Sequence, residues 1–245
     1  MPILRLLLLC FSFTWAIIPP AQSLTLGVEI TNYSPYYYLD NKQQYQGAAR
    51  EVFDLFTRVN TLKIRYSPMP VPRLFNEFVK GTVDLKFPDN PLWSASLHSD
   101  VKVFYSESIF SVRESLLVLK QEGVEIPKQE IKKVGTILGF SLPGIAKEVA
   151  NKEFETIQTQ EIDQLIHMLA AKRVEGVYFN ESVALDLAKK LYPKMTLAVH
   201  SQYPAFNYAY HLSSIKHPEL VTSFNQFLIS HAEQVAEIRR RYGLK

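Results

Sequence analysis

Cysteine is almost absent from this sequence, since its 245 residues contain only Cys10. Cys10 lies inside an apolar run near the N-terminus and follows Leu9, which is not the small residue expected before a lipid-attachment cysteine. We therefore interpret Cys10 as part of that run and not as a lipidation site. If the N-terminal segment is removed, the remaining chain has no cysteine. Disulfides and cysteine-ligated zinc are then excluded.

Glycine is also scarce, and the motifs that depend on it are missing. The sequence has 9 glycines and contains neither the dinucleotide-binding pattern G-x-G-x-x-G nor a P-loop. Its 6 histidines show no metal-ligand spacing such as H-E-x-x-H, and no G-x-S-x-G elbow marks a nucleophilic serine. We therefore expect no cofactor, no bound metal and no enzymatic activity.

Long apolar runs are missing as well. The longest run, residues 6–18, is shorter than the roughly 20 residues that a membrane span needs. It follows a positive start that ends at Arg5, and two prolines and the small-x-small sequence Ala-Gln-Ser at 21–23 come after it. This order is typical of a secretory signal peptide. We predict cleavage after Ser23 and export to the periplasm, in preference to a membrane anchor.

Positive and negative charges nearly balance, with a formal net charge of +3. The basic residues are dispersed and cluster only at Arg239, Arg240 and Arg241. A nucleic-acid-binding domain usually has a basic stripe, so we expect no nucleic-acid partner. Hydrophobic residues make up 47% of the chain, which is ample for one large domain or two small ones.

Strand-like apolar segments alternate with helical patterns along almost the whole chain. Val52, Phe53 and Phe56, for example, share one face of a predicted helix. Predicted strands cover residues 24–30, 63–66, 83–87, 115–119, 134–138, 176–179, 196–199 and 207–212. Predicted helices cover 47–59, 72–81, 144–154, 161–172 and 181–191, and one long helix runs from Pro218 to Ile238. The alternation indicates an α/β fold with mainly parallel sheets, in two lobes divided near residues 108–114.

Two of the loops expected after strands are rich in aromatic and polar residues. Residues 33–38 are Tyr-Ser-Pro-Tyr-Tyr-Tyr, and residues 86–93 are Lys-Phe-Pro-Asp-Asn-Pro-Leu-Trp. In open α/β sheets, ligands bind beyond the carboxyl ends of the strands. Aromatic walls with a few fixed polar groups are typical of small-molecule sites. Any single tyrosine here is more simply a residue at the edge of the core, but the cluster as a whole predicts a binding site.

Several short motifs follow one another along the chain after the signal segment. They are Tyr-Ser-Pro-Tyr at 33–36, Pro-Arg at 72–73, Gly-Thr-Val-Asp at 81–84, Val-Phe-Tyr-Ser at 103–106, Lys-Val-Gly-Thr at 133–136, Gly-Phe-Ser at 139–141 and Arg-Val-Glu-Gly-Val-Tyr-Phe-Asn at 173–180. In this order they resemble the periplasmic solute-binding proteins of the polar amino-acid ABC-transporter type, known as extracellular solute-binding protein family 3.

The resemblance implies a type II periplasmic-binding fold. Its two mainly parallel sheets are flanked by helices and joined by two crossing strands. Lobe 1 would comprise residues 24–110 and 206–245, and lobe 2 residues 111–205. The ligand would lie between the lobes, which close on it by hinge motion.

The sequence departs from this family at two positions that matter for the ligand. Members that bind α-amino acids hold the carboxylate with an arginine, and the matching position here is Ser99, beside His98. Their lobe-two aspartate, which pairs with the ligand ammonium, is matched by Asn180, followed by Glu181. These departures imply a small polar ligand that is amino-acid-like but not a standard α-amino acid.

We predict that aromatic side chains wall the ligand, that cations and the helix start near Ser141 hold negative groups, and that Asn180 donates or accepts a hydrogen bond. Arg73 and Arg113 could instead form surface ion pairs. Lys86 could be neutralised without any ligand, by Asp84 or Asp89. The predicted ligand-binding residues are Tyr36, Arg73, Lys86, Asp89, Asn90, Trp93, Ser141, Tyr178 and Asn180.

The function that this resemblance implies is capture of a small molecule for an ABC permease in the inner membrane, by a protein that we expect to be a monomer. One alternative is an enzyme on the same fold, similar to cyclohexadienyl dehydratases, with Glu181 as the candidate acid–base group. Another is a ligand-sensing protein that engages a membrane sensor. Fold analogy alone does not choose among the three.

Overall fold

A computed structural model describes residues 23–93, 101–120, 127–203 and 205–244. Except for Ser23, the predicted signal segment lies outside these ranges, and so do His98 and Ser99. No helix in the described part of the chain is both long enough and apolar enough to span a membrane.

The strands form one continuous ladder in which two parallel groups are joined by a central antiparallel pair. In the first group, β1 (Ser23–Glu29) lies between β4 (Lys63–Met69) and β5 (Leu85–Asp89), parallel to both. In the second group, β8 (Lys133–Ile137) lies between β9 (Glu155–Thr159) and β10 (Gly176–Asn180), again in parallel. This arrangement confirms the predicted α/β class.

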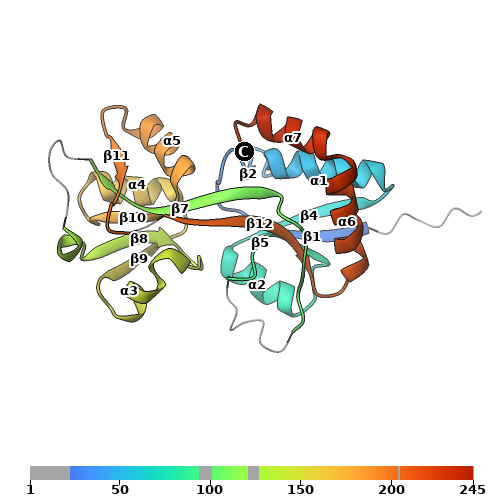
Figure 1. Cartoon of the computed structure of the whole chain (residues 1–245), viewed down its shortest axis with the longest axis horizontal. Helices are drawn as coiled ribbons and strands as arrows, with labels where there is room; N and C mark the ends of the chain where they lie inside the picture. The colour runs from blue at the N-terminus through green and yellow to red at the C-terminus, as the bar shows by residue number, and fades with distance from the viewer. Residues whose placement is uncertain (1–22, 94–100, 121–126, 204, 245) are drawn as a thin grey trace, which may run out of the picture.

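The two long strands β7 (Phe110–Leu119) and β12 (Phe206–Ser214) cross between the groups (Figure 1). They pair with each other, and β12 also pairs with β5 while β7 also pairs with β10. The two sheets are therefore hydrogen-bonded into a single path. Three short elements complete the strands: β6 (Phe104–Tyr105) beside β12, β11 (Leu197–Val199) beside β7, and the hairpin of β2 (Tyr38–Leu39) with β3 (Tyr45–Gln46).

Helices cover each group of strands, which gives two lobes on either side of the crossing pair (Figure 1). The first lobe carries α1 (Ala48–Val59), α2 (Val71–Val79), α6 (Pro218–Ser230) and α7 (Ala232–Arg241). The second carries α3 (Ala146–Ala150), α4 (Ile162–Ala170) and α5 (Glu181–Leu191), with short 3-10 turns at Lys128–Glu130 and Pro143–Ile145. The apolar faces of α1 and α2 are buried as their periodicity predicts.

Three sequence-based boundaries were wrong. The long C-terminal helix is broken at His231, whose φ of −118° and ψ of 26° leave the helical region, so that α7 turns back against α1. The helix predicted at 144–154 begins as a 3-10 turn and ends at Ala150, and a strand, β9, was not predicted. The strand predicted at 83–87 is β5, which runs from Leu85 to Asp89, so Asp89 lies inside the sheet, as Lys86 does, and not in the loop after it.

Candidate ligand-binding site

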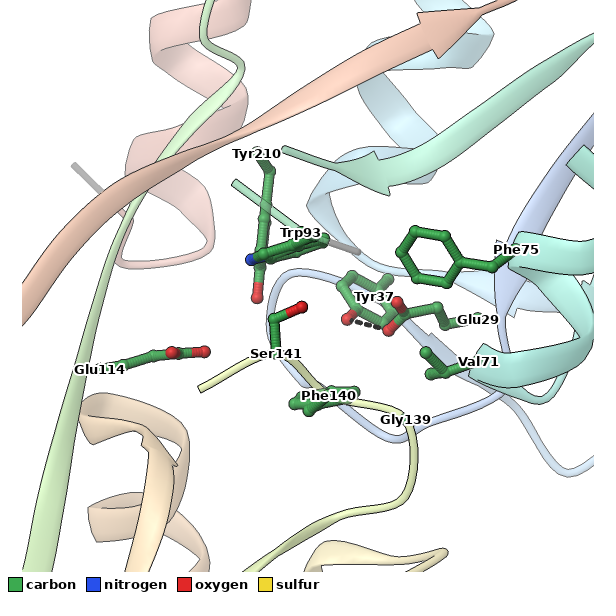
Figure 2. A pocket seen from close by; sticks show the side chains of 10 residues that line it. All are labelled: Glu29, Tyr37, Val71, Phe75, Trp93, Glu114, Gly139, Phe140, Ser141 and Tyr210. Carbon is green, nitrogen blue, oxygen red and sulfur yellow. Dashed lines mark hydrogen bonds between the residues drawn. The ribbon is translucent and has the colours of Figure 1, made fainter. Parts of the chain in front are cut away.

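A cavity lies between the two lobes, beside the crossing strands (Figure 2). It is formed where β1 ends at Glu29 and where the loop after β8 begins, so it lies at carboxyl ends of parallel strands, as ligand sites in open α/β sheets do. Both lobes and both crossing strands contribute to it. The described lining residues are Glu29, Tyr37, Val71, Phe75, Trp93, Glu114, Gly139, Phe140, Ser141 and Tyr210.

Aromatic residues make up half of the described lining of the cavity. Tyr37 stacks on Tyr33 with ring centroids 5.5 Å apart, and Tyr210 makes a tilted contact with Tyr37 (6.2 Å) and an edge-to-face contact with Trp93 (5.7 Å). Edge-to-face and offset-stacked pairs of this kind are favourable arrangements of aromatic quadrupoles. The predicted cluster at residues 33–38 therefore contributes Tyr37 to the wall and Tyr33 to the layer of rings behind it.

Glu29 is a buried carboxylate on the first-lobe side of the cavity, with 2% of its surface exposed. Its Oε2 accepts a hydrogen bond of 2.7 Å from the Tyr37 hydroxyl. Burial raises the pKa of Glu29 to about 7, although the Tyr37 hydrogen bond and the positive charge of Lys86 act in the opposite direction. Glu29 therefore changes its charge close to neutral pH.

Glu114 is a second buried carboxylate, on the crossing strand β7, and is also 2% exposed. In the ladder it is opposite Asn180 of β10 and Phe206 of β12, at the point where the two lobes join. The Tyr208 hydroxyl donates to its Oε1, whereas its Oε2 has no hydrogen-bond partner among the described residues. Burial raises the pKa of Glu114 to about 7, against the lowering effects of the Tyr208 and Tyr178 hydroxyls, and the charge of Glu29 raises it further.

Lys86 and Asp89 form a fully buried ion pair, with 2.7 Å between Nζ and Oδ1. The Lys86 ammonium also donates to the Pro88 carbonyl oxygen and lies 3.7 Å from the centre of the Phe75 ring. Burial lowers the pKa of Lys86, and Asp89 opposes that change. The alternative in which Asp89 neutralises Lys86 without a ligand is confirmed, since Asp84 instead pairs with Lys216 at 2.6 Å.

Of the other predicted site residues, Trp93 and Ser141 line the cavity, and Asn90 and Tyr178 do not appear among its described lining residues. Asn90 is buried and donates from Nδ2 to the Ala209 carbonyl oxygen at 2.8 Å. The Tyr178 hydroxyl accepts from the Gly144 backbone N–H at 3.1 Å. Both therefore fix loops close to the crossing strands.

Asn180 is buried at the start of α5, where its Oδ1 accepts the Val183 N–H and so caps the helix. Its backbone N–H donates to the Tyr33 hydroxyl at 3.2 Å, and its Nδ2 has no partner within the described ranges. Arg73 is exposed on α2 and is not among the described residues that line the cavity.

Tyr36, Arg113 and Glu181 line a second, larger hollow, of about 700 Å³, whose described lining also comes from both lobes and both crossing strands. Arg113 Nε lies 3.0 Å from Glu181 Oε2, and the Arg113 side chain is 56% exposed. The surface ion pair considered for Arg113 is confirmed. Glu181, the acid–base candidate of the enzyme alternative, is therefore placed outside the described lining of the interlobe cavity.

Glu29 and Glu114 were not predicted from the sequence. Glu29 lies in the apolar strand predicted at 24–30, and a carboxylate in such a strand needs a partner when it is buried. The argument applied to Lys86 would have drawn attention to Glu29, but not to Glu114, which lies between Arg113 and Ser115 just before the strand predicted at 115–119. Their shared position at one cavity, however, depends on strand pairing between residues far apart in the chain.

The lobes are in contact around the cavity. Phe140 of the second lobe packs against Tyr33 of the first, with ring centroids 5.8 Å apart, and Gly139 lies against Pro72 of α2. The free volume left in the cavity is only about 20 Å³, which is room for about one water molecule. A metabolite therefore needs the lobes, or the side chains between them, to move apart.

No group of three or more His, Cys, Asp or Glu side chains in the described part of the chain is arranged to hold a metal ion.

No protein-family model matches the sequence, and no curated protein matches it. Several solved structures match it in fold. An ancestral arginine-binding protein bound to arginine is 18% identical, with a TM-score of 0.72, covering 90% of this chain and 97% of that one. An ancestral amino-acid-binding protein, a precursor of cyclohexadienyl dehydratase, is 17% identical, with a TM-score of 0.71 and coverages of 90% and 94%.

A histidine kinase sensor domain with similarity to periplasmic binding proteins is 14% identical, with a TM-score of 0.73, covering 91% of this chain and 96% of that one. At these identities the likenesses establish the fold. The chain has the two-lobed type II periplasmic-binding-protein fold that its motif order predicted.

Proposed function

We propose that this protein is a periplasmic solute-binding protein that captures a small polar metabolite between two lobes. The observation that carries the proposal is the interlobe cavity, to which the first lobe gives Glu29 and Trp93 and the second lobe gives Phe140 and Ser141. A site built from both lobes closes on its ligand when they come together. The amino-acid-binding proteins that share this fold support a solute-binding role.

The lobes in this proposal are residues 24–110 with 206–245, and residues 111–205. The crossing strands β7 and β12 are the hinge, because they are the long connections that pass between the lobes. The chain is exported by its N-terminal segment and passes the solute to an ABC permease of the inner membrane, acting as a monomer.

A thermal-shift screen of the protein from Leu24 onward tests this function. Amino acids, organic acids, amines and sugars are added one at a time. A ligand at 100 times its Kd stabilises the fold by roughly 2.7 kcal/mol, which raises the Tm by several degrees for a domain of this size. If no class of small molecule raises the Tm, the solute-binding proposal is wrong.

Catalysis on the same fold is a second candidate, favoured by one observation. Two buried carboxyl groups with pKa values of about 7 face a single cavity, and a carboxyl group tuned to neutral pH suits general acid–base chemistry. Incubation with prephenate or arogenate tests this candidate directly. Appearance of an aromatic product that is lost in Glu114→Gln would establish a dehydratase, and its absence would dismiss one.

A sensing role is the third candidate, favoured by the fold shared with a histidine kinase sensor domain. Affinity purification of the tagged protein from cross-linked cells distinguishes it from transport. Recovery of a sensor kinase supports sensing, and recovery of a permease supports transport.

A further inference from the structure

We propose that the solute is a small organic cation with N–H donors and no carboxylate group, held between Glu29 and Glu114 inside the aromatic wall of the interlobe cavity. This inference rests on the proposed solute-binding function and names the class of ligand for that site. Figure 2 shows the two carboxylates on opposite sides of the cavity, pointing into it. The candidate ligands are therefore primary amines and guanidines.

The first argument is charge balance. The described residues that line the cavity include two carboxylates and no lysine, arginine or histidine. Lys86, whose positive charge acts on Glu29, is already paired with Asp89 in the core. A ligand cation would supply the missing positive charge, whereas a ligand carboxylate would add a third negative group to a buried site.

The second argument is the unsatisfied acceptor. Glu114 Oε2 is buried and has no hydrogen-bond partner of good geometry within the described ranges, although the nearby Tyr178 hydroxyl also lowers the pKa of Glu114. Leaving a buried charged acceptor unpaired is costly, and a charge-assisted hydrogen bond from N–H removes that cost. A quaternary ammonium has no N–H to donate, so the acceptor selects an amine or a guanidinium.

The third argument is the wall itself. Phe75, Trp93 and Phe140 line the cavity together with two tyrosines. Cations are attracted to the faces of aromatic rings within about 6 Å, most strongly when both are removed from water. Lys86 already demonstrates this attraction in the fold, 3.7 Å from the centre of the Phe75 ring.

Proton linkage follows from the same geometry. Tyr37, Lys86 and Asp89 act on Glu29. Tyr178, Tyr208 and the charge of Glu29 act on Glu114, which in turn acts on Tyr33 and Tyr210. Burial raises the pKa of all these tyrosines above their usual range, so they stay neutral at physiological pH. A carboxyl group with a pKa of about 7 is ionised in roughly one molecule in ten at pH 6 and nine in ten at pH 8.

If a carboxyl group must be ionised for the cation to bind, the affinity therefore increases about tenfold between pH 6 and pH 8 for each such group.

Isothermal titration of the protein from Leu24 onward tests the proposal with matched ligands. Agmatine differs from arginine by the absence of the carboxylate, and putrescine differs from choline in having N–H donors. We expect agmatine or putrescine to bind, arginine at least tenfold more weakly, and choline weakly or not at all. Affinity should increase at least tenfold from pH 6 to pH 8.

Variants locate the site. Glu29→Gln and Glu114→Gln keep the shape of each side chain, and each should weaken amine binding by at least about tenfold. Glu181→Gln is the matched control, since Glu181 pairs with Arg113 in the other hollow, and it should leave the affinity unchanged. The pH dependence of the unmodified protein provides a test even if a glutamine variant fails to fold.

The outcomes separate the two proposals. Strong binding of a carboxylic acid, an amino acid or a sugar without amine binding overturns the ligand class and leaves the solute-binding function standing. Amine binding that is unaffected by both glutamine variants and by pH overturns the site. If no solute of any class binds, the proposed function fails, and this inference fails with it.

Discussion

At the scale of single residues, Lys86 and Asp89 show how this protein holds a charge in its core. Both side chains are fully buried, 2.7 Å apart, and Asp89 also accepts from the Ser213 hydroxyl. Removing one partner of such a pair leaves a buried charge uncompensated, which is far more costly than losing an exposed pair.

Asp89→Asn should therefore lower the free energy of unfolding by roughly 3–5 kcal/mol. Asp186→Asn, which breaks the exposed Lys190–Asp186 pair of α5, should lower it by less than about 1 kcal/mol. Urea denaturation of both variants measures the difference. Equal losses would show that the Lys86–Asp89 pair is not buried as described.

Glu29 and Glu114 should make the ligand-free protein less stable as pH rises. Their pKa values of about 7 lie above the value of 4.5 expected in the unfolded chain, so the folded state binds more protons between these values. The contribution of these two groups to stability is complete below about pH 4.5 and is lost as pH rises from there through 7, by up to roughly 3 kcal/mol per group.

The free energy of unfolding at pH 5.5 and at pH 8 measures this effect. Glu114→Gln should reduce the difference between the two, because it removes one of the titrating groups. If the free energy of unfolding rises with pH over this range, Glu29 and Glu114 are not buried carboxyl groups with raised pKa values.

The sequence predicted some of these residue roles and not others. Lys86 lies in an apolar segment, so we predicted that it would need an internal partner. Asp89 was one of the two candidates named for that partner, and it forms the pair. The convergence of Glu29 with Glu114 could not be predicted in the same way. It depends on the register in which β7 meets β10 and β12, which is set by pairs of residues far apart in the chain.

At the scale of elements, local periodicity predicted the helices and strands well wherever one face packs on a sheet. It did not predict the break between α6 and α7, because Val235 and Ile238 continue the apolar pattern on the far side of His231 and are buried. The turn is determined by packing against α1, where Arg241 and Tyr242 bond to Glu51.

The loop after β8 lines the cavity with Gly139, Phe140 and Ser141 and lies against α2 of the first lobe. Gly139 has a φ of +83°, and an added Cβ would lie 2.9 Å from Pro72 Cγ across the lobe contact. Gly243 also has a positive φ, of +68°, but nothing lies within 4 Å of its added Cβ. Alanine substitutions at the two positions can therefore be compared: both introduce backbone strain, but only the one at Gly139 also crowds the contact between the lobes.

Gly139→Ala should weaken ligand binding by several-fold or more, because it separates the lobes, whereas Gly243→Ala should not. Both should lose about 1 kcal/mol of stability from strain at positive φ. Thermal unfolding and a ligand titration on each variant measure the two effects. Unchanged affinity in Gly139→Ala would mean that the contact with Pro72 is not part of closure.

At the scale of the whole molecule, the order of short motifs predicted the architecture more reliably than any single motif did. Two lobes joined by crossing strands were expected, and the ladder that runs through β7 and β12 joins them. The exact lobe limits at residues 110–111 and 205–206 stay predictions. Relative positions of lobes are not encoded in local pattern, so the tightness of the interlobe cavity was not foreseen.

The cavity of about 20 Å³ leaves no room for a metabolite. We expect the ligand-free protein in solution to be more open on average, and the radius of gyration from small-angle X-ray scattering to fall when a ligand is added. No change would indicate that side chains, and not lobes, admit the ligand.

The central claim is that a cationic solute lies between Glu29 and Glu114. A crystal structure of the protein with the amine that raises its Tm most tests this claim directly. We expect a ligand nitrogen within hydrogen-bonding distance, about 2.7–3.2 Å, of Glu114 Oε2, with the charged group against the aromatic wall that includes Trp93 and Phe140. A ligand bound outside this cavity, for example in the hollow beside Arg113, or one that turns an apolar part toward both carboxylates, would contradict it.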